Sequence, residues 1–331
     1  MPAATALVLG DSSTLQGCGG VARGHGGRDV ALAVRKSPSS TPPDDSAAQE
    51  ARSLYDAAVR SIDGLDHENF EWVQPTDPCG AGVVVIAGSS GALPIERARL
   101  LATHGLEVIA LRWFGGPGQN AGPYEIELEL FLYTLDTLAT VVDRVSMLGA
   151  SFGAEAALTV AARRPELASV VAISPTTHVW PGHDPEGRER SHWTMNGVAL
   201  PHVPLAEAWV PESDPPAFRP WYELSLEVAP DPASARIPVE FIIGDVVLVA
   251  GGDDRVWPSD DWARSISGRR AGAGRSTTMV VHPEAGHRPI LPGEGAPTAG
   301  QRMSRGGNPP ADAQLGRRAW PHILDVLGAA R

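Results

Sequence analysis

Between about residues 80 and 175, apolar runs of strand length alternate with stretches of helical periodicity. The run Gly82 to Ala87 (GVVVIA) is continuous and rich in β-branched residues, which is typical of a strand covered on both faces. The pattern predicts further strands at 70–73, 106–113, 145–148 and 168–174, and helices at 94–104, 124–142 and 152–164. Strands that alternate with helices favour right-handed crossovers and a mainly parallel sheet.

The alternation lapses from about residue 175 to 231, in a stretch rich in tryptophan, proline and histidine. It then resumes with predicted strands at 246–250 and 277–281 and helices at 259–266 and 311–327. We therefore predict one α/β domain over 49–331, with a cap inserted at about 176–231. Residues 1–48 are rich in Gly, Ser, Pro and Ala and indicate a linker-like or partly disordered segment with at most a short edge strand at 30–34, and 49–62 has helical spacing.

Composition narrows the classes of partner. The chain has 331 residues, of which 43% are apolar, and a formal charge of −12. An acidic chain does not attract phosphate backbones or anionic lipids, so we expect no nucleic acid and no membrane partner. Two cysteines, Cys18 and Cys79, and no convincing signal peptide favour free thiols in a reducing cytoplasm.

The segment Gly149 to Gly153 (GASFG) matches the G-x-S-x-G pattern of a nucleophile elbow. The serine of this motif sits on a tight strand-to-helix turn, so its neighbours two residues away must be small. A short apolar run precedes Ser151 and an alanine-rich helix follows it, as the motif requires. Ser151 is thus a candidate nucleophile, although a glycine-rich turn with a surface serine remains open.

A serine nucleophile needs a neutral histidine as base and a carboxylate that orients it, in the chain order Ser, acid, His. Asp254 follows the strand at 246–250 and is the predicted acid, with Asp253 as the alternative. We expect Ser259 and Asp260 to cap the next helix. His287 follows the last strand and is the predicted base, whereas His282 at the strand end is expected to pack.

Acyl transfer also needs backbone N–H groups around the developing oxyanion. We predict that Phe152 supplies one and Ser89, or else Ser90, supplies the other, although the GSSG loop could instead bind phosphate. Aromatic side chains could line an acyl pocket or simply pack the cap onto the sheet; the candidates are Trp113, Trp180, Trp193 and Trp257. The histidines of the inserted segment have irregular spacing, so we expect no metal and no cofactor.

Four blocks together resemble the C-terminal domain of the acyl-CoA thioesterase and bile acid-CoA:amino acid N-acyltransferase family. They cover roughly residues 80 to 330 and read GVVVIAGSSGALPIERARLLATHGLEVIALRWFG, GASFGAEAALTVAARRPELASVVAISP, GGDDRVWPS and PEAGH. The resemblance implies an α/β-hydrolase fold, a thioester substrate, and Ser151, Asp254 and His287 as the triad. Members that transfer the acyl group to an amine carry cysteine at the nucleophile position, so Ser151 favours hydrolysis. Mostly linker-like sequence precedes the first block, so we expect no counterpart there of the β-sandwich of animal members.

The sequence thus predicts a serine hydrolase acting on an acyl thioester or ester through an acyl-enzyme. Transfer of the acyl group to an amine or alcohol, ring closure, and ligand binding without turnover remain alternatives. The acyl group, its carrier (coenzyme A, an acyl carrier protein or a simple alcohol) and homo-oligomer formation are left open by the residues.

Overall fold

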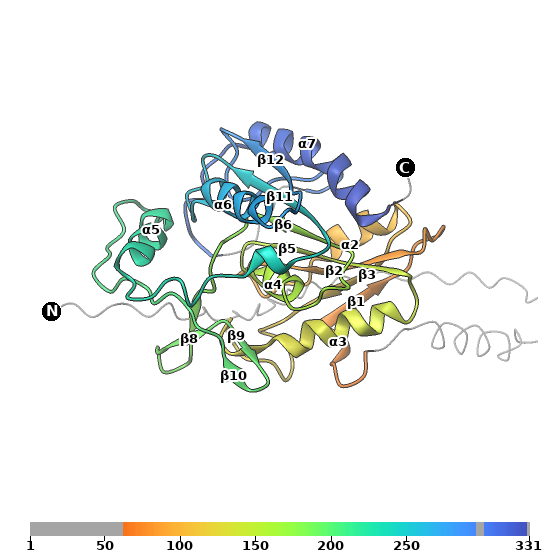
Figure 1. Cartoon of the computed structure of the whole chain (residues 1–331), viewed down its shortest axis with the longest axis horizontal. Helices are drawn as coiled ribbons and strands as arrows, with labels where there is room; N and C mark the ends of the chain where they lie inside the picture. Colours follow the sequence, from red (N-terminus) through yellow and green to blue (C-terminus); the bar gives the residue numbers. More distant parts are fainter. Residues whose placement is uncertain (1–61, 296–300, 330–331) are drawn as a thin grey trace, which may run out of the picture. The chain divides into compact units, whose positions relative to one another are not determined.

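A seven-stranded sheet carries the fold, and the computed structural model describes it within residues 62–295 and 301–329 (Figure 1). The strand order is β1-β3-β2-β5-β6-β11-β12. Only β1 runs antiparallel, beside β3, and the other neighbours in this sheet are parallel. The strands are β1 (Phe70–Val73), β2 (Ala81–Ile86), β3 (Glu107–Leu111), β5 (Arg144–Ala150), β6 (Ser169–Ile173), β11 (Asp245–Gly251) and β12 (Thr278–His282).

Helices cover both faces of this sheet, which is why its central strands read as continuous apolar runs. They are α2 (Ile95–Ala102), α3 (Leu128–Ala139), α4 (Phe152–Ala161), α6 (Ser259–Gly272) and α7 (Pro309–Leu327). One apolar cluster joins the sheet to α3, α4 and α6, and another joins it to α2 and α7. This sheet, with a strand–serine–helix turn after β5, is the α/β-hydrolase fold.

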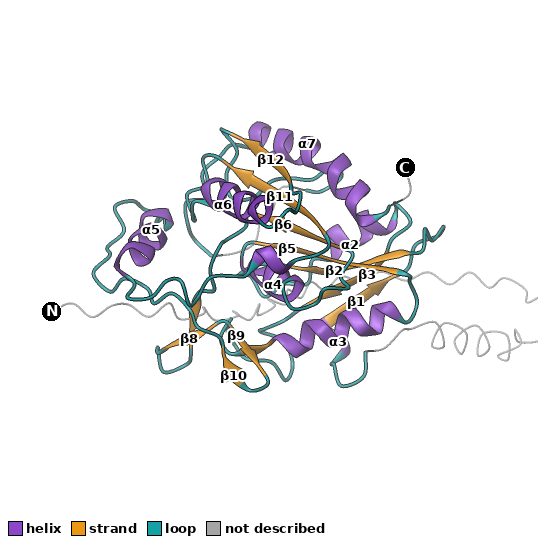
Figure 2. Ribbon diagram, viewed as in Figure 1, coloured by secondary structure: helices purple, strands orange, loops and turns teal. Residues whose placement is uncertain are grey.

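The residues between β6 and β11, 174–244, lie outside the central sheet, and we name them the β6–β11 segment. Figure 2 shows its helix α5 (Arg219–Val228) standing apart from the sheet. Its other elements are β7 (Pro181–His183), β8 (Glu189–Ser191), β9 (Trp193–Met195), β10 (Val198–Ala199) and the 3-10 helix η2 (Val239–Phe241). A further 3-10 helix, η1 (His67–Asn69), precedes β1. Strand β9 pairs with β4 (Ile126–Glu127), so the segment is tied to the chain just before α3.

The predicted strands and helices of the sheet are confirmed, with shifts of a few residues at most ends and of six at the end of α6, which reaches Gly272. The helix predicted at 124–142 begins later, at Leu128. Glu125 has a left-handed φ of 48°, and the N–H groups of Glu125 and Ile126 donate to carbonyls of the β6–β11 segment. Tertiary pairing therefore overrides the helical periodicity at this point. The predictions for 1–48, for 49–61 and for Cys18 lie outside the described residues.

Cys79 is a free thiol. Within 62–295 and 301–329, no helix combines the length and the apolar character needed to cross a bilayer.

Candidate active site

Ser151 occupies a strained turn between the end of β5 and the start of α4. Its φ of 57° and ψ of −123° belong to a region that non-glycine residues rarely adopt. A Cβ at Gly149 would stand 2.0 Å from the Gly153 carbonyl oxygen, and one at Gly153 would stand 2.5 Å from that of Ala87. The turn therefore needs small residues two positions on either side of the serine, as the motif predicts.

His287 lies on the loop after β12 and reaches the serine. Its Nε2 is 2.9 Å from Ser151 Oγ, and only 7% of the residue is exposed. Two backbone contacts hold it: its N–H donates to the Arg305 carbonyl at 2.9 Å, and its own carbonyl accepts from Ser174 Oγ at 2.8 Å. The backbone that carries the imidazole is thus held by two other parts of the chain.

Asp254 lies on the loop after β11 and completes the chain of hydrogen bonds. Its Oδ2 is 2.8 Å from His287 Nδ1 and also accepts from Ser259 Oγ at 2.6 Å. Its Oδ1 accepts from the N–H groups of Val256 and Trp257. An ionised carboxylate only accepts hydrogen bonds, so the tautomer that fits this contact carries its hydrogen on Nδ1 and turns an acceptor Nε2 towards Ser151 Oγ.

The two alternatives from the sequence lie elsewhere. Asp253 binds Arg255 at 3.0 Å and the N–H of Gly307 at 2.8 Å. Burial acts to raise the pKa of Asp253, but these two hydrogen bonds outweigh it and the pKa is lowered. His282 is bound through Nε2 to Gln314 at 2.9 Å, which agrees with its expected packing role. Neither side chain is bonded to Ser151 or His287.

The loop after β2 borders the serine. A Cβ at Gly88 would lie 2.8 Å from Ser151 Cβ, so the backbone of this loop passes directly beside the hydroxyl. Among the described residues, neither the N–H of Phe152 nor that of Ser89 donates a hydrogen bond within the protein. The side chain of Ser90 instead accepts from the N–H of Ala92 at 3.4 Å. The oxyanion roles of Phe152, Ser89 and Ser90 stay predictions.

The four tryptophans predicted as pocket lining are interior residues: Trp113, Trp180, Trp193 and Trp257 are each at most 1% exposed. Their indole N–H groups all donate within the protein, to Ala87 O, Thr176 Oγ1, a Glu155 carboxylate oxygen and Ser174 O respectively. In this structure the four tryptophans therefore pack in the interior, which is the other interpretation that the sequence allowed.

The sequence did not predict the contacts of three residues in and around the site. Ser259 was expected to cap α6, yet α6 has no side-chain cap and Ser259 instead donates to Asp254. Ser174, which has a φ of 49°, anchors the backbone of His287. Glu155, fully buried on α4, contacts His192 and Trp193. An acidic residue in the otherwise apolar helix AEAALTVAA was the available signal for the last of these.

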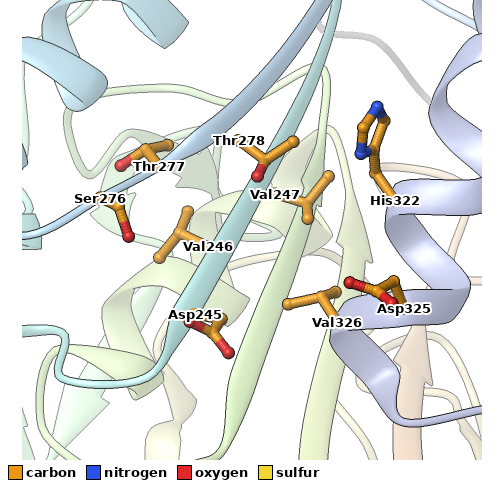
Figure 3. A pocket seen from close by; sticks show the side chains of 9 residues that line it. All are labelled: Asp245, Val246, Val247, Ser276, Thr277, Thr278, His322, Asp325 and Val326. Atoms are coloured by element: carbon orange, nitrogen blue, oxygen red, sulfur yellow. The ribbon is translucent and has the colours of Figure 1, made fainter.

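A pocket lies between β11, β12 and α7, and neither Ser151, Asp254 nor His287 lines it (Figure 3). Asp245 and Thr278 are the first residues of their strands, so this pocket is at the amino ends of the strands. Ser151, Asp254 and His287 follow the carboxyl ends, where α/β sheets bind their ligands. In the part of the chain that the structure describes, no group of three or more His, Cys, Asp or Glu residues could hold a metal ion.

Among solved structures, similar chains include a putative dienelactone hydrolase from Klebsiella pneumoniae subsp. pneumoniae. It has a TM-score of 0.45 and 15% identity, over 78% of this chain and 91% of that one. A dienelactone hydrolase from Anabaena variabilis has a TM-score of 0.44 and 17% identity, over 82% of this chain and 95% of that one.

Among curated proteins, the mouse (Mus musculus) acyl-coenzyme A amino acid N-acyltransferase 2 is 27% identical over 73% of this chain and 58% of its own length. Mouse acyl-coenzyme A thioesterase 6 is also 27% identical, over 73% of this chain and 58% of its own length. The chain thus spans less than two thirds of these relatives. The family model described as BAAT / Acyl-CoA thioester hydrolase C terminal matches residues 131–329, more than half of the chain. The chain belongs to this family.

Proposed function

We propose that this protein hydrolyses acyl thioesters through a covalent acyl-enzyme on Ser151. The observation that carries the proposal is the continuous hydrogen-bonded series from Ser151 Oγ through the His287 ring to Asp254. The names of the relatives, thioesterases and N-acyltransferases of acyl-coenzyme A, supply the substrate class.

In the first step, Ser151 Oγ attacks the thioester carbonyl carbon while His287 Nε2 takes its proton. The resulting imidazolium is stabilised by Asp254, which holds it through Nδ1 at 2.8 Å. The carbonyl oxygen becomes an oxyanion, for which the N–H groups of Phe152 and Ser89 are the proposed donors. One such donor typically contributes about 3 kcal/mol in the transition state.

The tetrahedral intermediate then collapses. The carbon–sulfur bond breaks, the thiol leaves with the proton from His287, and the acyl group remains as an ester on Ser151. In deacylation, water attacks this ester, His287 takes the water proton and returns it to Ser151 Oγ, and the carboxylic acid is released. Each cycle consumes one thioester and one water.

The β6–β11 segment, which contains the insertion predicted at about 176–231, is the proposed cap over this chemistry. Two contacts support the proposal. The ring of His192 lies 4.3 Å from that of Phe152, next to the nucleophile, and the N–H of Arg219 donates to the carbonyl of Arg255 on the acid loop. A cap in this position would bound the acyl side of the site.

Acyl transfer to an amine is the second candidate, because mouse relatives of similar identity carry N-acyltransferase names. The acyl-enzyme would be the same, and an amine would attack it in place of water. A fold that binds a ligand without turnover is the third possibility.

The test is fluorophosphonate labelling of the full chain followed by intact-mass measurement. A single adduct on wild type that is missing in Ser151→Ala is expected for the first two candidates, and an unlabelled wild type would favour the third. A panel of acyl-CoA thioesters and simple esters, assayed with and without amine acceptors, then separates hydrolysis from transfer. An amide product at the expense of free acid would overturn hydrolysis as the main reaction.

A further inference from the structure

A second imidazole–carboxylate pair lies one helical turn from the nucleophile. Glu155 follows Ser151 on α4, and its N–H donates to the Ser151 carbonyl at 3.1 Å. Its side chain is fully buried and accepts hydrogen bonds from the N–H of Trp180 at 3.1 Å and from Trp193 Nε1 at 2.7 Å. A third donor, His192 Nδ1, lies 3.1 Å away.

The other nitrogen of His192 has nothing to bind. The residue is 0% exposed, and its Nε2 is among the buried side-chain atoms without a hydrogen-bond partner in the described part of the chain. A buried polar atom left unpaired costs about 1–3 kcal/mol. Trp180 and Trp193 both donate to Oε1 of Glu155, so the contact that pairs Oε2 is the one with His192 Nδ1, at 3.2 Å. That contact accounts for Nδ1 and leaves Nε2 unexplained.

The position of this nitrogen relates it to the reaction centre. The His192 ring packs 4.3 Å from the ring of Phe152, the residue directly after Ser151. Phe152 is half-buried, whereas His192 is 0% exposed, so of these two packed rings only that of Phe152 belongs to a residue that solvent reaches. Nδ1 is directed at α4, and Nε2, on the opposite side of the ring, is directed away from it. Burial lowers the pKa of His202 and its electrostatic interaction with His192 lowers it further, so a second imidazole lies near His192.

We propose that His192 Nε2 recognises a hydroxyl group on the acyl chain of the substrate, with Glu155 as the residue that positions the ring. This proposal rests on the thioesterase function proposed above. A hydroxyl suits the nitrogen in either protonation state, because it donates to a neutral Nε2 and accepts from a protonated one. The Phe152 ring must turn to admit the chain, so the hydroxyl is recognised at some distance from the reacting carbonyl. A purely aliphatic chain would leave Nε2 unpaired.

The experiment compares matched acyl thioesters with and without one hydroxyl, moved along the chain, on the full-length wild type and on His192→Asn. Asparagine keeps an N–H that can donate to Glu155 but has no atom in the place of Nε2. We expect wild type to favour one hydroxyacyl thioester by tenfold or more in kcat/KM, and His192→Asn to reduce that ratio to about twofold or less. Fluorophosphonate labelling of Ser151, measured in parallel, reports whether each variant keeps a reactive nucleophile. The matched control is His183→Asn, at an exposed histidine of the same segment, which should leave the ratio unchanged.

A wild type with no hydroxyl preference, or a ratio equal in wild type and His192→Asn, would overturn the proposal. A second measurement serves if the variant fails to fold or the chain shows no thioesterase activity. The imidazole nitrogen resonances of His192 in Ser151→Ala are followed during titration with the hydroxy acid and with the plain acid. A shift of Nε2 with the hydroxy acid only supports recognition, and no difference between the acids refutes it. If wild type shows neither fluorophosphonate labelling nor thioester turnover, but the His192 Nε2 shift with the hydroxy acid is seen, the proposed thioesterase function is refuted and the recognition of a hydroxyl by His192 is retained.

Discussion

His287 at the sheet edge and His192 in the β6–β11 segment each place Nδ1 against a buried carboxylate, at 2.8 and 3.1 Å. They differ in what Nε2 meets. That of His287 has the Ser151 hydroxyl at 2.9 Å, and that of His192 has no partner within the described ranges. A carboxylate fixes the tautomer in both cases, but only an adjacent nucleophile makes an imidazole a candidate base. The comparison also extends to His178, a third buried imidazole, which has a threonine instead of a carboxylate at Nδ1.

Removing the base is the strongest way to separate the two pairs. His287→Ala leaves the Ser151 hydroxyl without a proton acceptor, so we expect acylation to fall by about 10⁴-fold or more. The measurement is the single-turnover rate of acyl-enzyme formation, beside the fluorophosphonate labelling rate. His192→Asn should acylate with a plain thioester at a rate within about threefold of wild type. Equal losses in the two variants would contradict the distinction drawn here.

The acid at the sheet edge can be tested against its neighbour. Asp254→Asn keeps the size of the side chain, but its carbonyl oxygen is needed by the N–H groups of Val256 and Trp257, so the N–H₂ group faces Nδ1. A donor at this position disfavours the tautomer with Nε2 free. We expect kcat to fall by about 10³- to 10⁴-fold. Asp253 is one residue away and is bonded to Arg255 and Gly307. Asp253→Asn should therefore lower kcat by less than about threefold. Steady-state kinetics on both variants decides, and a larger loss at 253 would make Asp253 the acid.

His178 extends the comparison to an imidazole without a carboxylate partner. Burial, together with the charges of Arg236 and Arg269, lowers the pKa of His178 from 6.5 to about 4. Between these two values the unfolded chain binds a proton that the folded chain does not. Stability is therefore fully present above pH 6.5 and is lost as the pH falls towards 4, by about 3 kcal/mol in total. Urea unfolding measured from pH 7 to 4 should show that the free energy of unfolding declines less steeply for His178→Asn than for wild type. Parallel declines in the two proteins would refute this.

The sheet edge and the β6–β11 segment also differ in how far sequence could predict them. Continuous apolar runs located the strands, the GASFG turn located Ser151, and the fold's chain order pointed to Asp254 and His287, three side chains that the structure brings together. Their catalytic roles remain predictions. The Glu155–His192 contact joins α4 to a segment that lacks a regular hydrophobic pattern, so no local sequence pattern predicts it. The four tryptophans illustrate the same limit, because aromatic composition does not distinguish a pocket wall from a packed interior.

Ser259 offers the finest test of how the reactive pair is held. Its hydroxyl donates to Asp254 Oδ2, the same oxygen that His287 binds, at 2.6 Å. Hydrogen bonds to charged groups contribute about 1.5–3 kcal/mol, and Asp254 retains its two backbone donors in Ser259→Ala. We expect kcat to fall by about tenfold with KM little changed, because the carboxylate is less firmly oriented rather than lost. Ser265→Ala, at an exposed position of the same helix, is the matched control and should match wild type. If Ser259→Ala also matches wild type, the backbone N–H groups of Val256 and Trp257 alone orient the acid.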